Sequence, residues 1–454
     1  MHSQPRRLQS FLSTCHPAVF NAYAMAIAFL VYFCMYGFRK PFAAGTYDGL
    51  SLLGSTIDLK TAFIISQILG YALSKYLGVK FCPEVSRRRR ALLLFGLVMF
   101  AEAALVAFAV LPPAWKVLAM FFNGLPLGMI WGLVVWFLEG RRTSEFLLAG
   151  LSCSFIIASG VVKGIGVALI EGQPALGPWL PLTLQPVPEF WMPAVVGALF
   201  ALPFTLFVWM LDQLPEPNTE DIRQRSARRT MSVGDRIAFV KRYLPGLLAL
   251  VVPYVLLTAF RDFRDNYQKE VLIEMKVDPD QIAGALTSME TKIAFGVLAV
   301  MAAVYFIRDN SRALLAIVAV IGGGLLLMGA ATLLRQRGAI DAYRWLMLLG
   351  LGAYLAYVPY NTVLFDRFMA STRAVGTAVF AIYVADALGY TGSVAVLLFS
   401  DLAVGDMSRL RFLEGFSYAV SIIGAALIGC FALYLICQKS AYAAPQEVTT
   451  DPVE

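Results

Sequence analysis

The sequence predicts an all-α protein that crosses a lipid bilayer twelve times. Of its 454 residues, 59% are hydrophobic and only 15% are charged, whereas about a quarter of the residues in soluble domains are charged. The apolar residues fall into blocks of roughly twenty, which is the length of a helix that spans a hydrocarbon core of about 30 Å. Strands of a transmembrane barrel would be about ten residues long with alternating polarity, and no block alternates.

The blocks divide into six before and six after a long polar stretch. The predicted spans are 18–38, 59–81, 91–111, 115–138, 146–170, 190–211, 244–266, 282–306, 313–334, 343–365, 374–400 and 412–437. They imply an N-terminal bundle over 1–211, a central cytoplasmic loop over 212–243, a C-terminal bundle over 244–438 and a cytoplasmic tail over 439–454. This is the plan of the major facilitator superfamily, in which two pseudo-symmetric six-helix bundles hold the substrate between them near the middle of the membrane.

The lysines and arginines indicate how the chain is oriented. Most of the 37 fall in the tails and in every second loop, including the cluster between Arg223 and Arg242. Cytoplasmic loops carry such an excess, so both termini are expected in the cytoplasm. The net charge of +7 follows from this bias and gives no evidence for binding of nucleic acid. No feature of the sequence indicates an organelle, so we expect the protein in a bacterial inner membrane. We also expect it to be a monomer.

Several other functions are disfavoured. The six cysteines form no C-x-x-C pair and none lies in a predicted outer loop, so neither a disulfide framework nor a zinc site is expected. No phosphate-cradling G-x-x-x-x-G-K-[ST] motif occurs, which argues against ATP as the energy source. H-E-x-x-H and G-x-S-x-G are absent too, and the two histidines, His2 and His16, precede the first span. We therefore expect neither an enzyme nor a cofactor.

Charged residues inside the predicted spans are the candidates for a binding site. A charge near the bilayer centre costs at least about 2.5–3.5 kcal/mol. Each charged residue in a span therefore indicates a structural or functional role. The first span ends in "YGFRKPF", with Arg39 and Lys40, and the seventh carries "AFRD", with Arg261 at the equivalent place. The other candidates are Lys75, Lys163, Glu290, Lys292 and Asp386.

These charges allow more than one interpretation. Arg39 could be a plain anchor at the membrane surface. Lys163 and Asp386 lie in symmetry-equivalent spans and could pair across the halves. Glu290 and Lys292 are two residues apart, so they point away from each other and at least one of them needs another partner. Arginine suits phosphate because its planar fork donates two parallel hydrogen bonds, and one arginine from each half could draw the halves together around an anion.

Five segments resemble the organophosphate:phosphate antiporters, the carriers of glycerol phosphate and hexose phosphate. "YGFRKPF" resembles their Tyr-x-x-Arg-Lys-Asn-Phe signature, and "FRDFRDNYQKEV" resembles a segment in which an arginine precedes Tyr-x-Lys-Glu-Val. "YALSKYLG", "SMETKIAFG" and "AVGTAVFAIYVADALGYTGSVAV" are similar to parts of their second, eighth and eleventh helices. The resemblance implies that Arg39 and Arg261 bind phosphate, that Lys75 adds positive potential within the membrane, and that Glu290 belongs to the ion-pair network of the site.

Two departures from that family alter the expected site. The family has a histidine in its fifth helix, where this chain has Lys163, so Lys163 is expected to supply a different positive contact to the substrate. Asp386 is an acid in a stretch that we expect to be apolar, which makes a proton-coupled variant an alternative. Lys40 and Lys292 complete the candidates for ion pairing or coupling.

The sequence thus predicts a secondary active transporter that moves a small organic anion by alternating access. The preferred substrate is a phosphorylated metabolite, either a sugar phosphate or glycerol phosphate, in exchange for inorganic phosphate. Two alternatives stay open: a proton-coupled carrier of another organic anion such as a carboxylate, and a transporter-like sensor that binds its ligand without moving it. The expected partners are the small anion, phosphate or protons, and the lipid bilayer.

Overall fold

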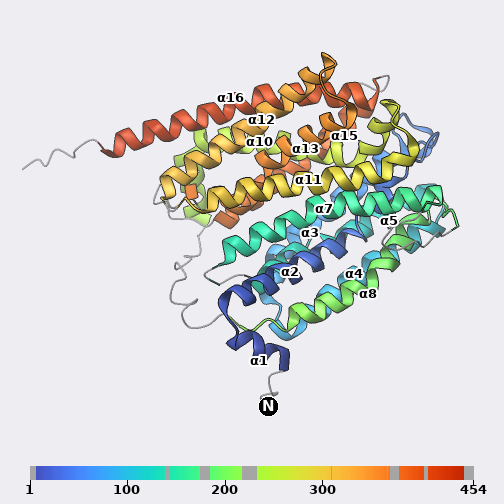
Figure 1. The fold of residues 1–454 in the computed structure, drawn as a ribbon, viewed down its shortest axis with the longest axis horizontal. Coiled ribbons are helices and arrows are strands. Elements are labelled where there is room, and N and C mark those ends of the chain that lie inside the picture. The colour runs from blue at the N-terminus through green and yellow to red at the C-terminus, as the bar shows by residue number, and fades with distance from the viewer. Residues whose placement is uncertain are drawn as a thin grey trace, which may run out of the picture.

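Long helices run side by side along the whole molecule in the computed structural model (Figure 1). The structure describes residues 7–138, 141, 143–173, 185–216, 233–307, 309–365, 367–368, 378–402 and 407–443. Within these ranges there is no β-strand, and all twelve predicted spans coincide with helical segments. The predicted all-α fold is confirmed.

The bounds of the helices follow the predicted spans closely. The first half of the chain contains α1 (Arg7–Thr14), α2 (Pro17–Tyr36), η1 (Pro41–Ala44), η2 (Leu52–Gly54), α3 (Leu59–Glu84), α4 (Arg87–Val110), α5 (Pro113–Leu127), α6 (Ile130–Leu138), α7 (Ser144–Glu171) and α8 (Met192–Asp212). The second half contains α10 (Val233–Glu274), α11 (Pro279–Tyr305), α12 (Asn310–Gln336), α13 (Ala342–Thr362), α15 (Ala378–Leu402) and α16 (Arg409–Ala443). Helices α5 and α6 form one span, and α10 begins inside the predicted central loop.

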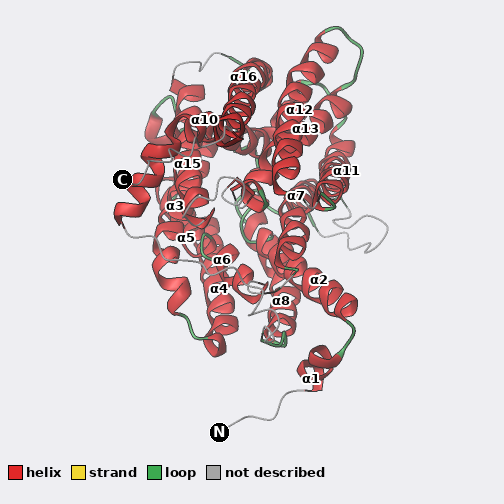
Figure 2. Cartoon of the chain, turned by 90° about the vertical axis from the view of Figure 1, so that its left-hand side faces the viewer, coloured by secondary structure: helices red, strands yellow, loops and turns green. Residues whose placement is uncertain are grey.

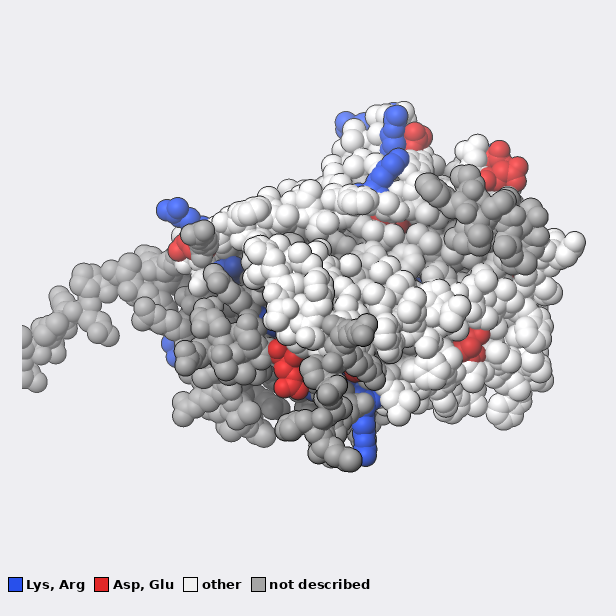
Figure 3. All heavy atoms as spheres, turned by 60° about the horizontal axis from the view of Figure 1, so that its bottom comes forward, with Lys and Arg blue, Asp and Glu red and all other residues white. Residues whose placement is uncertain are grey.

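The outer surface of the helices suits a lipid environment. Nine helical segments in the described part of the chain are long and apolar enough to cross a membrane; α3, α13 and α15 are the remaining three spans. Large apolar side chains point outward, among them Leu202, which is 79% exposed. On the face drawn in Figure 3, charged side chains are few and scattered among the described residues. An apolar surface of this extent marks contact with lipid, so the chain is an integral membrane protein.

The two halves of the chain form two groups of helices, one below the other in Figure 1. Helix α7 packs on α11, and α3 packs on α15, so both contacts join the groups (Figure 2). In the order of the spans, these contacts pair the fifth with the eighth and the second with the eleventh. In two pseudo-symmetric halves of six spans, the second span corresponds to the eighth and the fifth to the eleventh. Exchanging the halves therefore converts one contact into the other, as the pseudo-symmetry predicted from the sequence requires.

Glycines allow these helices to touch backbone to backbone. A Cβ atom on Gly160 of α7 would lie 2.5 Å from the carbonyl oxygen of Leu286 of α11, and one on Gly164 would lie 2.5 Å from Thr287 Oγ1. Within the first half, a Cβ on Gly124 of α5 would lie 2.1 Å from a carbonyl oxygen of α3. Small residues favour helix association in lipid, where close van der Waals packing replaces the hydrophobic effect.

The first membrane span of each half, α2 or α10, is irregular where the two halves meet. Helix α2 ends at Tyr36, and Pro41, which cannot continue an α-helix, begins η1 shortly after it. Helix α10 departs from helical geometry at Tyr267, with φ −110° and ψ 15°. Side chains bind backbone carbonyl groups at both places: Gln67 Nε2 donates to the carbonyl of Arg39 (2.9 Å), for example. Irregular backbone inside a membrane is tolerated where protein groups satisfy it in this way.

Ion pairs join the halves at the end of the molecule that carries η1, on the right of Figure 1. Lys60 of α3 donates to the carbonyl of Gly45 (2.8 Å) and pairs with Glu270 of α10. Lys269 of α10 donates to the carbonyl of Ala44 (3.0 Å). The start of α16 adds Arg409, which pairs with Asp58 (2.6 Å) and Asp401 (2.7 Å). We call this set, Lys60, Glu270, Lys269, Arg409, Asp58 and Asp401, the η1-end clamp.

Gly124→Ala is expected to destabilise the protein, because the new methyl group would overlap the carbonyl oxygen of Gln67. Overpacking of this kind costs about 1–3 kcal/mol. The measurement is the midpoint of thermal unfolding of the purified protein in detergent. Gly96→Ala is the matched control, because a Cβ on Gly96 of α4 meets nothing within 4 Å. Equal midpoints for the two variants would contradict the close contact of α3 with α5.

Candidate functional site

Ten charged side chains gather in the interior, around the irregular parts of α2 and α10. They are Arg39, Lys40, Lys75, Lys163, Arg261, Asp262, Arg264, Asp265, Glu290 and Asp386, and we call them the central network. The most exposed of the paired members, Lys75, shows 18% of its side chain. Charges buried to this degree are costly unless they have partners. The partners of each charged side chain therefore indicate its role.

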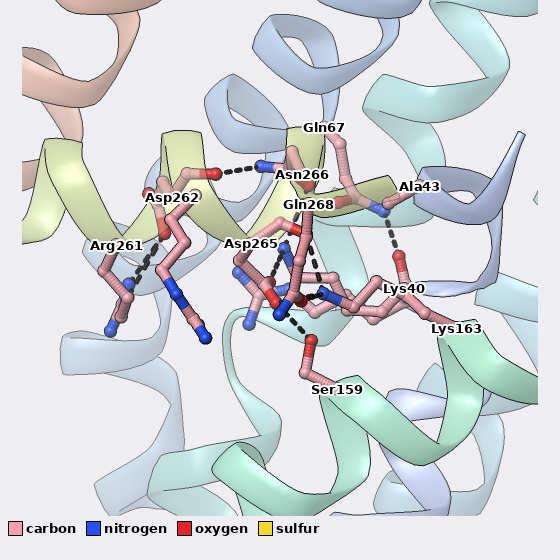
Figure 4. A network of polar contacts seen from close by, with 12 residues as sticks. Lys40, Ala43, Gln67, Ser159, Lys163, Arg261, Asp262, Asp265, Asn266 and Gln268 are labelled. Atoms are coloured by element: carbon pink, nitrogen blue, oxygen red, sulfur yellow. Dashed lines mark hydrogen bonds and ion pairs between the residues drawn. The ribbon is translucent and has the colours of Figure 1, made fainter. Parts of the chain in front are cut away.

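Asp265 of α10 lies at the centre of the network (Figure 4). Its Oδ1 accepts hydrogen bonds from Lys163 Nζ (2.7 Å) and from the hydroxyl of Ser159, both on α7. Its Oδ2 pairs with Lys40 Nζ (2.6 Å). Lys163 also donates to the backbone carbonyl of Asp265 (2.8 Å) and to Gln268 Oε1 (2.9 Å), so all three of its hydrogens have partners. One carboxylate of the second half therefore binds two lysines of the first.

Arg264 and Glu290 form a second pair, inside the second half. Arg264 Nη1 donates to Glu290 Oε1 (2.8 Å), and the two side chains are 1% and 0% exposed. Gln268 Nε2 donates to the same oxygen (3.1 Å), and Arg264 Nη2 donates to the carbonyl of Leu346 (3.0 Å). These contacts tie α10 to α11 and α13. The pair thus stabilises the second half rather than linking it to the first.

Lys75 and Asp386 form a third pair, which crosses between the halves. Lys75 lies on α3 and pairs with Asp386 Oδ2 on α15, while Tyr254 of α10 donates to the other carboxylate oxygen. The Lys75 ammonium also lies 5.6 Å from the centre of the Tyr71 ring and 5.2 Å from that of Tyr390. Cations at such distances are attracted to the face of an aromatic ring.

Both predicted phosphate-binding arginines stack on tyrosine rings. The Arg39 guanidinium lies 4.0 Å from the centre of the Tyr71 ring, and that of Arg261 lies 4.1 Å from the centre of the Tyr357 ring. Tyr36, at the end of α2, interacts electrostatically with both guanidiniums. One arginine from each half and a set of tyrosines therefore meet in the same region.

Arg39 differs from the other cations of the network, because no carboxylate of the described residues lies within ion-pair distance of it. Only 7% of Arg39 is exposed, and its buried Nε has no hydrogen-bond partner in the described part of the chain. Arg261, in contrast, pairs with Asp262 (2.9 Å). A buried guanidinium without a counter-charge inside a membrane protein calls for an anion from outside the chain.

The charges of the central network do not balance. Six cations face four carboxylates, which leaves an excess of two positive charges among these described residues. The excess is concentrated on Arg39, which has no carboxylate, and on Lys40 and Lys163, which share one. A dianion bound beside Arg39 and Lys40 would neutralise the network.

The structure brings together seven of the eight candidate residues from the sequence: Arg39, Lys40, Lys75, Lys163, Arg261, Glu290 and Asp386. Lys292 lies outside the network, since its side chain is exposed and its ammonium lies 5.1 Å from the Tyr343 ring. As its spacing from Glu290 indicated, the two side chains point in different directions. The interpretation of Arg39 as a surface anchor is wrong, because the side chain is buried.

The alternative salt bridge between Lys163 and Asp386 is not formed. Lys163 pairs with Asp265, and Asp386 pairs with Lys75. Sequence reasoning also did not include Asp262, Arg264 and Asp265 among the site residues. The signal was present in the sequence, because "FRDFRDN" places four charges between positions 261 and 265 on a predicted membrane helix.

Solved structures of membrane transporters share the fold. The chain is similar to a bacterial homologue of the human lysosomal transporter Spinster in an inward-facing and occupied conformation, with a TM-score of 0.58 and 12% identity over 93% of this chain and 96% of that one. It is also similar to the nucleoside transporter NupG, with a TM-score of 0.56 and 13% identity over 90% and 98% of the two chains. At these identities the likeness shows the fold alone, which is the fold predicted from the sequence.

The sequence places the chain in one family. A family model matches residues 41–438, and the chain belongs to that family, which is described as a family of unknown function (DUF5690). No curated protein matches the chain. The resemblance to the organophosphate:phosphate antiporters therefore stays a prediction.

Arg264→Met is expected to destabilise the protein strongly, because it leaves the Glu290 carboxylate buried without its partner. Breaking a buried ion pair from one side costs about 3–5 kcal/mol. The double variant with Glu290→Gln removes the stranded charge and should recover much of the loss. The measurement is the thermal unfolding midpoint in detergent for both single variants and the double variant. Additive effects of the two substitutions would contradict a direct pair.

Proposed function

We propose that this protein is a secondary transporter that carries a small organic anion by alternating access. The observation that carries the proposal is the excess positive charge of the central network around Arg39. The fold supports it, because the solved structures that it resembles are transporters. In this fold, substrates bind between the two halves near the middle of the membrane, and ion pairs of the central network join the two halves.

We propose a phosphorylated metabolite as the substrate, exchanged for inorganic phosphate. A phosphate monoester carries about 1.5 to 2 negative charges near neutral pH, which matches the excess of two. Each half contributes one arginine whose guanidinium lies over a tyrosine ring, 4.0 Å from the ring centre for Arg39 and 4.1 Å for Arg261. Arg261 uses Nε and Nη2 for Asp262, which leaves Nη1 for the anion.

The lysines take different roles in this proposal. Lys40 has two hydrogen-bond partners, Asp265 and Asn266, so one of its hydrogens is available to the anion next to Arg39. Lys163 has all three hydrogens bound by Asp265 and Gln268. It therefore supplies positive potential and holds Asp265 in place, rather than touching the substrate as the sequence predicted.

The charge excess also favours exchange over net transport. When the halves rearrange without an anion, two uncompensated positive charges must pass through a low-dielectric interior, where their energy is high. A bound dianion removes this cost. The loaded carrier should therefore change its orientation readily, whereas the empty carrier should do so slowly.

Arg39→Lys and Arg261→Lys are each expected to reduce phosphate exchange about tenfold to a hundredfold, since lysine keeps the charge but loses the fork, and hydrogen bonds to charged groups contribute about 1.5–3 kcal/mol. The measurement is uptake of labelled phosphate into proteoliposomes loaded with phosphate. Arg344→Lys is the matched control, because the Arg344 side chain is 66% exposed and its ion pair among the described residues is with Asp341.

The same experiment separates the proposal from its alternatives. Phosphate binding without exchange would favour the sensor. Uptake of carboxylates but not phosphate, with the same dependence on Arg39 and Arg261, would favour a carboxylate carrier. Exchange that survives both substitutions would contradict an anion site at the two arginines.

A further inference from the structure

We propose that Gln67 and Asn123 are positioning residues of the anion site. Their side-chain amides hold the backbone at Arg39, so that its guanidinium is directed at the substrate. The inference rests on the proposed function and deepens it, because it names the groups that orient the arginine that has no carboxylate among the described residues. Neither amide is proposed to touch the anion.

The break between α2 and η1 leaves two carbonyl groups without a backbone partner. Helix α2 ends at Tyr36, and Pro41 has no N–H group with which to continue the hydrogen bonds of the helix. Among the described residues, no backbone N–H donates to the carbonyl groups of Phe38 and Arg39. An unpaired carbonyl group is costly inside a membrane protein, so side chains have to bind these two.

Two buried carboxamides bind both carbonyl groups. Gln67 Nε2 donates to the carbonyl of Arg39 (2.9 Å) and to Asn123 Oδ1 (2.7 Å). Asn123 Nδ2 donates to the carbonyl groups of Phe38 (2.9 Å) and of Ala101 on α4 (3.1 Å). All four amide hydrogens therefore have acceptors. A carboxylate of the same shape has no hydrogen to donate, so the pattern requires an amide at both positions.

Helix α3 holds Arg39 at both of its ends. Gln67 and Tyr71 are four residues apart on α3, so they lie on the same face of the helix. Gln67 binds the backbone carbonyl of Arg39, and the Tyr71 ring centre lies 4.0 Å from the guanidinium. Helix α5 supports this arrangement through Asn123, since the neighbouring Gly124 lets α5 approach the backbone of α3 closely.

The amides also affect the electrostatic potential at the site. Carbonyl oxygens at the C-terminal end of a helix carry partial negative charge, which repels an anion. The carbonyl groups of Phe38 and Arg39 lie just beyond the end of α2, and the amides of Gln67 and Asn123 place partial positive charge against them. The positive potential of Arg39 therefore stays available to the anion.

The test measures phosphate binding by the purified wild-type protein, Gln67→Met and Asn123→Ala, each with and without Arg39→Lys. If the amides act through Arg39, either substitution should raise the phosphate dissociation constant about tenfold, as expected when one charge-assisted hydrogen bond is weakened. In the Arg39→Lys protein the same substitutions should change it by less than about twofold, because the fork is already lost. A merely structural role would give the same factor in both proteins.

Thr332→Val is the matched control. Thr332 is fully buried on α12, and its hydroxyl group forms hydrogen bonds with Met328, Ser417 and Trp345. Its loss should lower the thermal unfolding midpoint without changing the affinity for phosphate. Gln67→Asn is a milder third variant in case the other two do not fold. It keeps an amide that is one methylene shorter, and it should weaken phosphate binding in the same direction.

The outcomes separate this inference from the proposed function. Unchanged affinity in the Gln67 and Asn123 variants, an equal loss in the Arg39→Lys protein, or an equal loss in Thr332→Val would overturn the positioning role and leave the anion carrier intact. If wild type binds no phosphate, the proposed substrate fails, and the NMR signal of the Arg39 side chain decides instead. The Tyr71 ring shifts this signal, which is identified by its loss in Arg39→Lys. A change in the Gln67 or Asn123 variant but not in Thr332→Val supports the inference, and an unchanged signal overturns it.

Discussion

The attraction between Asp265 and the two lysines of the other half is the interaction on which the interior depends. Without it, Lys40 and Lys163 would be uncompensated charges inside the bilayer, each at a cost of several kcal/mol. With it, one carboxylate satisfies both lysines and holds α2, α7 and α10 together. One carboxylate shared between two lysines, together with an arginine that has no carboxylate among the described residues, leaves two positive charges in the interior, and the proposed anion site rests on this excess.

The membrane spans could be predicted from the sequence because burial in lipid is decided by local composition. The inward-facing charges could be predicted for the same reason: the cost of Arg39 or Glu290 in a bilayer does not depend on which partner it finds. The partners themselves could not, because they depend on the rotation of each helix and on its irregularities. Lys163 meets Asp265 rather than Asp386, and Lys292 turns outward, and neither follows from spacing along one helix.

Two sets of ion pairs join the halves, one at the η1 end and one in the central network. In the η1-end clamp, lysines bind backbone carbonyl groups as well as carboxylates, and Arg409 binds two acids at once. In the central network, Lys163 and Lys40 pair with Asp265 and Lys75 pairs with Asp386 across the halves. Under the proposed function, the clamp sets how much of the binding energy must be used to separate the halves at that end.

The contact between α7 and α11 has a mechanical consequence. Gly160 and Gly164 let the two backbones approach closely, since a Cβ atom on either glycine would lie 2.5 Å or 2.8 Å from a carbonyl oxygen of α11. Interlocked side chains would have to leave their grooves before one helix could turn against the other, and this would add a barrier at every step. Under the proposed alternating access, glycines on α7 leave fewer such grooves to cross than larger residues would when α7 turns against α11.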